Sequence, residues 1–257
     1  MCTMSKESQQ AFAETAAVVF CVTFFWAHGS PERYRSREPM AQAAKSAGVL
    51  HVIWSTRNTA IDFRSRILWM PTLHRRVQGA HFDARAKRIR CSAARIRRPS
   101  VWPLTSFYWD NLIHFGMGPK QGPDGTLAFT LPMGEARLPG IAAEDIGKCV
   151  LGLMKKRDAY LGTTVGIAGE HLTGSQMAVA LTKAFGREVR YNAVSPEVYR
   201  TFGFPGADEL GNMFQFKRDF NAAFCGARNP VIARTLNPSL QTFAQWLEGN
   251  KNQIPLS

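Results

Sequence analysis

The sequence lacks an apolar run long enough to cross a membrane. Its longest run, residues 16–27, is shorter than the ~20 residues that a membrane-spanning helix needs, and Glu14 and His28 flank it closely. Residues 1–10 are mixed and polar, so the basic start and small-residue cleavage site of a secretory signal are missing as well. We therefore expect a cytoplasmic protein without a membrane partner.

Cysteine and histidine are too sparse and too scattered for a disulfide framework or a metal site. The five cysteines are an odd number without a Cys-x-x-Cys pair, which favours reduced thiols that pack as small hydrophobes. The six histidines lie far apart, with no His-x-x-x-His and no acid at ligand spacing. A Gly-x-Ser-x-Gly nucleophile elbow is also absent. We expect no metal ligands and no hydrolase chemistry.

Acidic residues are scarce in one segment, and this accounts for most of the formal net charge of +13. Residues 57–98 hold 12 Lys or Arg against two acids, whereas the rest of the chain holds 20 basic and 17 acidic residues. The run 85–98 could bind nucleic-acid phosphates, but it offers no aromatic side chain on which a base could stack. Ile89, Ala93 and Ile96 follow helical spacing, so we favour a helix with a solvated basic face.

Two apolar stretches, separated by an alanine-rich one, predict a βαβ unit. Residues 15–26 form a nearly unbroken β-branched and aromatic run, which is typical of a strand buried on both faces of a parallel sheet. Residues 40–47 favour a helix that ends at Gly48, and residues 49–55 favour a second buried strand. The chain is therefore of the α/β class, with strand ends that point toward a ligand crevice.

Beyond Trp102 the pattern predicts a part rich in helices. The segment 145–156 shows one apolar stripe, with acids at its start and bases at its end. Thr173 and Gln176 suit a capping box, with Gly186 as the stop. The other predicted elements are strands at 127–131 and 164–168, a turn at 122–125, and helices around 108–115, 196–202, 207–216 and 240–250, the last with Phe243, Trp246 and Leu247 buried.

Seven short segments, spread over almost the whole chain, follow one another in an order and at separations that are informative together. They are residues 20–26 (Phe-Cys-Val-Thr-Phe-Phe-Trp), 81–83 (His-Phe-Asp), 106–111 (Ser-Phe-Tyr-Trp-Asp-Asn), 143–147 (Ala-Glu-Asp-Ile-Gly), 203–208 (Gly-Phe-Pro-Gly-Ala-Asp), 236–238 (Leu-Asn-Pro) and 246–247 (Trp-Leu). Together they resemble the NmrA-like family, atypical short-chain dehydrogenase relatives that bind NAD or NADP and often act as redox sensors or regulators. The resemblance implies a Rossmann-type parallel sheet with an α-rich C-terminal cap subdomain.

The glycine-rich turn with which such proteins begin is missing. A Gly-x-x-Gly-x-x-Gly turn binds the pyrophosphate through its amides and a helix N-terminus, whereas the first glycine of this chain is Gly29. We therefore expect a truncated Rossmann-type sheet. Residues 1–106 would be the remnant of the NAD(P)-binding domain, and residues 107–257 the C-terminal part with the cap. An edge strand at 16–22 would then be exposed and could pair with another chain.

The basic segment is the second departure from the family pattern. The family continues His-Phe-Asp-x with Lys-Gly-Glu and an amphipathic helix, whereas residues 85–90 read Arg-Ala-Lys-Arg-Ile-Arg. We hypothesise an altered reading frame within residues 57–101, because one permitted codon set for residues 84–88, with one base inserted after the codon of Ala84, would read Ala-Lys-Gly-Glu-Ala. Sequencing the gene across these codons tests this, and the idea fails if no single-base shift restores an amphipathic helix.

The resemblance also implies which residues would contact a dinucleotide. They follow the two predicted strands, stand in place of a ribose-binding lysine, or open the helix near residue 110: Thr23, Phe24, Trp26, Ala27, His28, Ser55, Thr56, Arg85, Tyr108, Trp109, Asp110 and Asn111. Two alternatives stay open. The aromatic residues at 24–26 could be core side chains, and Asp110 could be only a helix cap.

No catalytic residue can be assigned from the sequence. A working short-chain dehydrogenase needs a Tyr-x-x-x-Lys pair, and none of the five tyrosines is followed four residues later by lysine. We therefore expect NAD(P) binding of a regulatory, redox-sensor or reductase-like type, weakened by the missing turn, with at most atypical NAD(P)-dependent oxidoreductase activity on a small molecule. A protein-interaction module that uses the cap is the alternative, and a nucleic-acid binder is the less favoured one.

Overall fold

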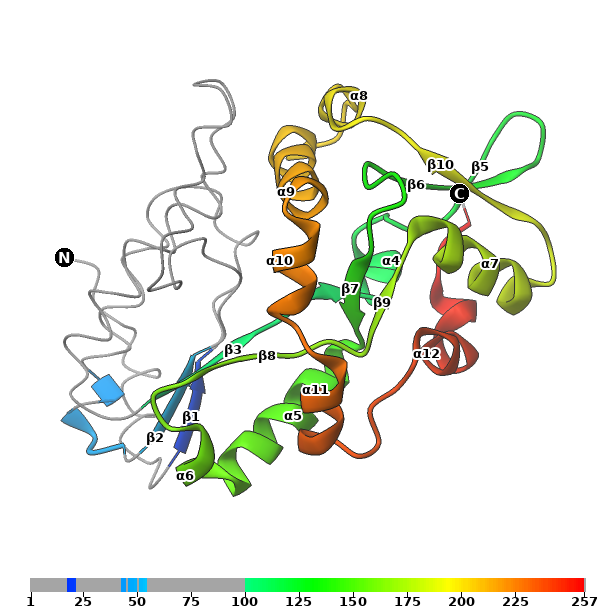
Figure 1. Cartoon of the computed structure of the whole chain (residues 1–257). Coiled ribbons are helices and arrows are strands. Elements are labelled where there is room, and N and C mark those ends of the chain that lie inside the picture. Colours follow the sequence, from blue (N-terminus) through cyan, green and yellow to red (C-terminus); the bar gives the residue numbers. More distant parts are fainter. Residues whose placement is uncertain (1–17, 22–42, 45, 50, 55–99, 257) are drawn as a thin grey trace. The chain divides into compact units, whose positions relative to one another are not determined.

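The computed structural model describes residues 18–21, 43–44, 46–49, 51–54 and 100–256 (Figure 1). The chain divides into two compact units, one of residues 1–104 with 153–165 and the other of residues 105–152 with 166–257. Each unit is described by itself below. The domain boundary between residues 106 and 107 stays a prediction.

The first unit contains a parallel arrangement of strands. β1 (Val18–Cys21), β2 (His51–Trp54), β3 (Ser100–Leu104) and β8 (Thr164–Gly166) form a four-stranded sheet in that order. β1 runs parallel to β2, with Val18 opposite His51, and β2 runs parallel to β3. Helical residues lie between β1 and β2 in the chain, and Gly48 closes them with a φ of 70°. The predicted α/β class and its parallel βαβ unit are confirmed.

A small apolar core holds these strands together. Cys21, Ala44 and Val49 pack with Val52, and Trp102 lies partly buried against the group. Each of these positions belongs to one of the two apolar runs, to the alanine-rich segment between them, or to β3. Burial of the Cys21 thiol agrees with its prediction as a small hydrophobe.

The second unit contains two three-stranded sheets. β10 (Val189–Ala193), β6 (Leu127–Leu131) and β5 (Lys120–Gln121) form one, and β4 (Phe107–Tyr108), β7 (Leu138–Ile141) and β9 (Glu170–Leu172) form the other. β6 alternates buried and half-buried residues along its length and confirms the predicted strand. The strands β7, β9 and β10 are not apparent in the sequence pattern, because they are short and two of them are mostly exposed or half-buried.

Much of the second unit is helical (Figure 1, green to red). The helices are α4 (Asn111–His114), α5 (Ala143–Lys155), α6 (Arg157–Tyr160), α7 (Gly174–Phe185), α8 (Pro196–Arg200), α9 (Ala207–Asp219), α10 (Asn221–Gly226), α11 (Pro230–Leu236), α12 (Phe243–Asn250) and the 3-10 helix η2 (Lys251–Gln253). Of these, α6 and the last residues of α5 belong to the first unit. Among the described residues, none of these helices combines the length and apolar character needed to traverse a membrane.

The local helix signals are confirmed where the structure describes them. Thr173 and Gln176 form the reciprocal capping box of α7, and Gly186 ends that helix in the left-handed conformation. In α12 the residues Phe243 and Trp246 are buried as expected. One expectation is wrong: the helix predicted around 108–115 begins only at Asn111. Residues 107–108 form β4 instead, because they pair with β7.

Candidate functional site

The predicted cofactor-binding residues divide between described and undescribed parts of the chain. Tyr108, Trp109, Asp110 and Asn111 lie in the described second unit. The remaining ones lie outside the described residues: Thr23, Phe24, Trp26, Ala27, His28, Ser55, Thr56 and Arg85. In the chain, Thr23 comes two residues after β1 and Ser55 directly after β2. The core-versus-ligand alternative for residues 24–26 therefore stays open.

The Trp109 side chain belongs to the hydrophobic core. Its ring is 1% exposed and lies 5.4 Å from the ring of Phe243 and 6.3 Å from that of Trp246, measured between centroids. Glycine makes room for it: a Cβ atom at Gly140 would come within 2.2 Å of the indole nitrogen, and one at Gly169 within 2.8 Å of the far ring edge. The ring thus anchors the segment, and a cofactor contact by Trp109 stays a prediction.

Asp110 caps a helix, although not the one expected. It stands at the N-cap of α4, yet its side chain makes no capping hydrogen bond there. Instead, its Oδ2 accepts a hydrogen bond of 2.7 Å from the backbone N–H of Ala143, the first residue of α5. A carboxylate at this place satisfies a free amide and complements the helix dipole. Asp110 therefore connects the 108–111 turn to a helix that begins 33 residues later.

The polar residues around β4 differ in how fully they are satisfied. The Tyr108 hydroxyl lies 3.2 Å from the Thr105 hydroxyl, and both side chains are at least partly buried. Within the described part of the chain, the Ser106 hydroxyl is buried without a hydrogen-bond partner. Asn111 is half-buried, and its carbonyl accepts hydrogen bonds from the N–H groups of Phe115 and Met117. Tyr108, Asp110 and Asn111 are all partly exposed, but the Asp110 carboxylate is already bonded to Ala143. Tyr108 and Asn111 are therefore the predicted residues here whose side chains can turn to a ligand.

Two buried cations support the residues that lead into β4. Arg228 is 1% exposed; its Nε donates to the Thr105 carbonyl at 2.8 Å, and its guanidinium lies 3.8 Å from the ring centre of Phe224. The Lys217 Nζ lies 4.9 Å from the ring centre of Phe214, and this lysine is 6% exposed. A cation over an aromatic face gains electrostatic energy that increases when water is excluded. The sequence offers no signal for the bond from Arg228 to Thr105, because the two residues lie 123 positions apart in the chain.

His171 adds a further polar contact to Arg228. Its Nε2 lies 2.6 Å from the Arg228 carbonyl oxygen, so the ring donates its Nε2 proton there. Burial, helped by the charges of Arg137 and Arg228, lowers the pKa of His171 despite this hydrogen bond. The ring is therefore a neutral donor at neutral pH.

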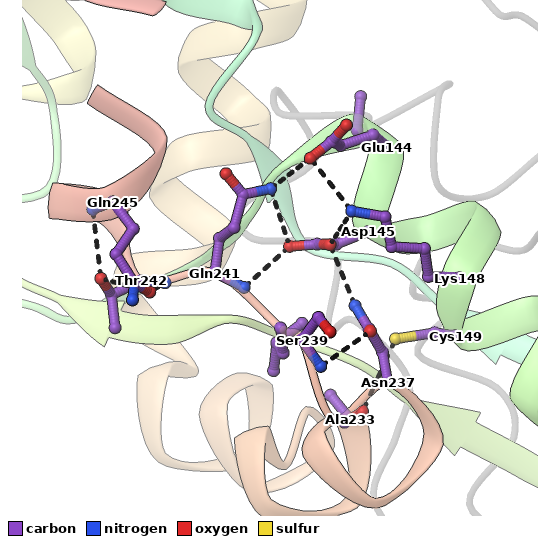
Figure 2. A network of polar contacts seen from close by, with 12 residues as sticks. Glu144, Asp145, Lys148, Cys149, Ala233, Asn237, Ser239, Gln241, Thr242 and Gln245 are labelled. Carbon is purple, nitrogen blue, oxygen red and sulfur yellow. Dashed lines mark hydrogen bonds and ion pairs between the residues drawn. The ribbon is translucent and has the colours of Figure 1, made fainter. Parts of the chain in front are cut away.

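A buried carboxylate joins α5 to the segment before α12. Figure 2 shows Asp145 facing Asn237 and Gln241. Asp145 is fully buried; its Oδ1 accepts from the side-chain amide of Asn237 at 2.9 Å, and its Oδ2 accepts from the backbone N–H of Gln241 at 2.9 Å. Lys148 lies 3.2 Å from Oδ1. The segments 143–147 and 236–238, singled out separately in the sequence, thus meet in one network.

The cysteines and acids of the described residues do not form a reactive or metal-binding cluster. The Cys149 thiol points at the Ala233 carbonyl at 3.7 Å, and burial, with the nearby Asp145 charge, raises its pKa to about 12. Burial also raises the pKa of Cys225. Among described residues, no three His, Cys, Asp or Glu side chains come together as metal ligands. These thiols are protonated at neutral pH and pack as apolar groups.

Known proteins resemble this chain in sequence or in fold. A curated NAD(P)H azoreductase of Xenophilus azovorans is 26% identical over 172 residues, which are 65% of this chain and 52% of that protein. The chain therefore spans about half the length of this curated relative. NmrA, a negative transcriptional regulator, superposes with a TM-score of 0.70 at 20% identity over 94% of this chain and 76% of NmrA.

Two further solved structures carry a dinucleotide. NmrA in complex with NADP has a TM-score of 0.68 at 19% identity and covers 94% of this chain and 75% of its own. The triphenylmethane reductase of Citrobacter sp., complexed with NADP(H), has a TM-score of 0.66 at 15% identity and covers 96% and 79%. Likenesses at these identities show the shared fold. The model of the NmrA-like family matches residues 3–247, and this chain belongs to that family.

Proposed function

We propose that this chain binds NAD or NADP and serves a regulatory, redox-sensing or reductase-like role. The observation that supports this proposal most directly is the parallel pairing of β1 with β2 and of β2 with β3. Dinucleotides bind beyond the carboxyl ends of parallel strands in open α/β sheets. In the chain, the predicted contacts 23–24, 26–28 and 55–56 follow the carboxyl ends of two neighbouring strands of that sheet. Family membership and the dinucleotide complexes of NmrA and the triphenylmethane reductase support the same proposal.

The proposed contacts differ in what they can offer. Tyr108 and Asn111 have half-buried side chains that can reach a ligand. The Asp110 carboxylate is already bound to Ala143, and the Trp109 ring is buried, so these two would act mainly by holding the backbone. The other proposed contacts are those outside the described residues, from Thr23 to Arg85. The proposal covers both NAD and NADP as ligands.

We propose that the 257 residues bind the dinucleotide weakly. No Gly-x-x-Gly-x-x-Gly turn occurs in the sequence, and the amides of such a turn supply much of the pyrophosphate recognition. Calorimetry with NADH and NADPH should give dissociation constants on the order of 0.1–1 mM. Asn111→Ala should weaken binding, whereas Asn250→Ala, in α12, serves as a control. A folded chain that gives no heat with either dinucleotide up to several millimolar contradicts the function, and a nanomolar constant contradicts only the weakening.

Catalysis would be of an atypical kind. The chain has no Tyr-x-x-x-Lys pair, and we assign no catalytic proton donor. The names of the azoreductase and the triphenylmethane reductase make dye reduction the activity to assay first. NADPH oxidation measured with and without an azo dye separates a reductase-like role from a purely regulatory one. A cytoplasmic location stays part of this proposal.

A protein-interaction role is the alternative, and one surface favours it. Val231 on α11 is 70% exposed, and Ile232 beside it is 37% exposed. Exposed apolar side chains that adjoin one another are typical of interaction surfaces. Val231→Asp in the full chain should abolish capture of a partner in a pull-down and leave dinucleotide binding unchanged. The nucleic-acid alternative concerns residues 85–98, which lie outside the described residues.

A further inference from the structure

The turn at residues 108–111 is held at two adjacent points. The Trp109 ring packs between α12 side chains and the glycine backbone at Gly140. The next side chain, Asp110, accepts the first backbone N–H of α5. The backbone between these two anchors has little freedom, because a core aromatic ring and a hydrogen-bonded helix start both constrain it. The position of the turn therefore depends on where α5 and α12 lie relative to each other.

Asp145 joins α5 to the segment that leads into α12. Every group that contacts its carboxylate is a hydrogen-bond donor: the Asn237 amide, the Gln241 backbone N–H, the Gln241 side-chain amide and the Lys148 ammonium. Asn237 is fixed in turn, because its own oxygen accepts from the Ser239 N–H at 3.1 Å. Figure 2 shows the carboxylate at the centre of these groups.

The start of α12 transmits this fixation to Trp109. Thr242 and Gln245 form a capping box directly after Gln241, and the Glu170 carboxylate accepts the Phe243 N–H at 2.6 Å. Phe243 and Trp246, which contact Trp109, are therefore set by residues 237–242. The contacts form a closed ring: from the turn to α5 through Asp110, from α5 to residues 237–241 through Asp145, and back to the turn through α12.

We propose that Asp145 is a positioning residue that fixes the 108–111 turn, and through it the affinity for the dinucleotide. The second half of this statement rests on the proposed function. Asp145 itself is fully buried and bonded only within the ring of contacts, so it acts through Asp110 and Trp109 rather than by touching the ligand. Its loss should therefore loosen residues that lie far from it in the chain.

Asp145→Asn breaks the ring with almost no change of shape. Each partner donates, so the new amide group must point one donor at another, and at least one buried group loses its partner. Lys148→Met is the matched control. It removes the ammonium from the same carboxylate, but the lysine side chain is 45% exposed and leaves the Asn237 and Gln241 bonds intact. Gln241→Leu, which removes only the side-chain amide, is a milder variant if Asp145→Asn does not fold.

The reciprocal double variant Asp145→Asn/Asn237→Asp restores the direction of the bonds. The amide introduced at position 145 can donate to a carboxylate at position 237, and its oxygen can accept the Gln241 N–H. The carboxylate at position 237 still accepts the Ser239 N–H. Net charge and volume are unchanged. Rescue by this swap is expected only if hydrogen-bond direction, rather than the bare presence of a buried acid at 145, holds the ring together.

Native-state hydrogen exchange provides a readout that does not need a dinucleotide. The Ile113 and His114 amides both donate to the Asp110 carbonyl at 3.0 Å and report on the turn. Asp145→Asn should speed their exchange about tenfold or more, while amides of β6, which pairs with β10, change much less. Lys148→Met should match the parent chain, and the swap should return most of the protection.

Dinucleotide titrations with the same variants complete the test. Asp145→Asn should raise the NADPH dissociation constant about tenfold, and the swap should lower it again. Unchanged exchange at Ile113 and His114 in a folded Asp145→Asn protein overturns the proposal, as does an equal rise of exchange in β6. If no variant binds NADPH while the exchange pattern follows the expectation, the proposed function fails and the positioning of the turn by Asp145 stands.

Discussion

At the scale of single residues, the fit between Trp109 and two glycines decides whether the 108–111 turn can be anchored. The indole nitrogen lies so close to Gly140 that a Cβ atom there would be only 2.2 Å from it. The ring is buried against Phe243 and Trp246 and has no room to withdraw. A glycine in a short strand normally weakens it, and here close packing explains its presence.

Gly140→Ala should therefore destabilise the protein by about 1–3 kcal/mol or more, the usual cost of overpacking a core. Gly147→Ala is the matched control, because a Cβ atom there meets nothing within 4 Å and the residue lies inside α5. That change should stabilise by about 0.5–1 kcal/mol. Urea unfolding of both variants measures the difference. Equal stability of the two alanine variants contradicts the packing described for Trp109.

His171 makes stability depend on pH in a predictable direction. Its pKa is lowered in the folded state by burial, so below about pH 6.5 the unfolded chain takes up a proton that the native ring resists. The contribution of His171 is complete above that pH and is lost as the pH falls further. His171→Gln keeps a donor toward the Arg228 carbonyl and should flatten this part of the profile. The free energy of unfolding of both proteins is measured between pH 7.5 and 5. A difference between the two that stays constant over this range would exclude the effect.

At the scale of elements, helix starts are encoded locally, and α7 is the clearest case. The Thr173 hydroxyl accepts the Gln176 N–H at 3.1 Å, and the Gln176 side chain accepts the Thr173 N–H at 2.9 Å. Thr173→Ala should cost about 1 kcal/mol of stability, whereas Thr173→Ser keeps the hydroxyl and should cost less. Thermal unfolding of the two variants provides the comparison. If Thr173→Ser and Thr173→Ala destabilise the protein equally, the capping hydrogen bond of the hydroxyl does not account for the loss of stability.

Elements were predictable in proportion to how local their determinants are. The stripe of α5, the capping box of α7 and the alternation of β6 each lie within a few turns of the chain and could be identified beforehand. β7 reads Leu-Pro-Gly-Ile, which no strand pattern favours. It forms because Phe107 pairs with Gly140 on one side and Leu138 pairs with Leu172 on the other. Its partners lie more than 30 residues away, so propensity cannot indicate it.

At the scale of the whole molecule, we expect the edge of the first sheet to govern self-association. Among the described strands, β1 stands at one end of the sheet order, beside β2 alone. An exposed apolar edge strand can pair with another chain. We expect association that rises with concentration in light scattering, and Phe20→Lys should reduce it by placing a charge on β1. Phe115→Lys, at a phenylalanine that is 49% exposed and lies outside the sheets, is the control. A monomer at every concentration contradicts this expectation.

The α/β class, the parallel βαβ unit, the starts and stops of the principal helices and the family could all be predicted from the residues alone. These properties follow from periodicity and from short-range hydrogen bonding, which a few neighbouring residues decide. Three contacts emerge only in the folded chain: Asp110 caps α5, Asp145 joins Asn237 and Gln241, and Arg228 supports Thr105. Buried polar groups take whichever partners the packed chain brings to them, and those partners lie between 33 and 123 residues away.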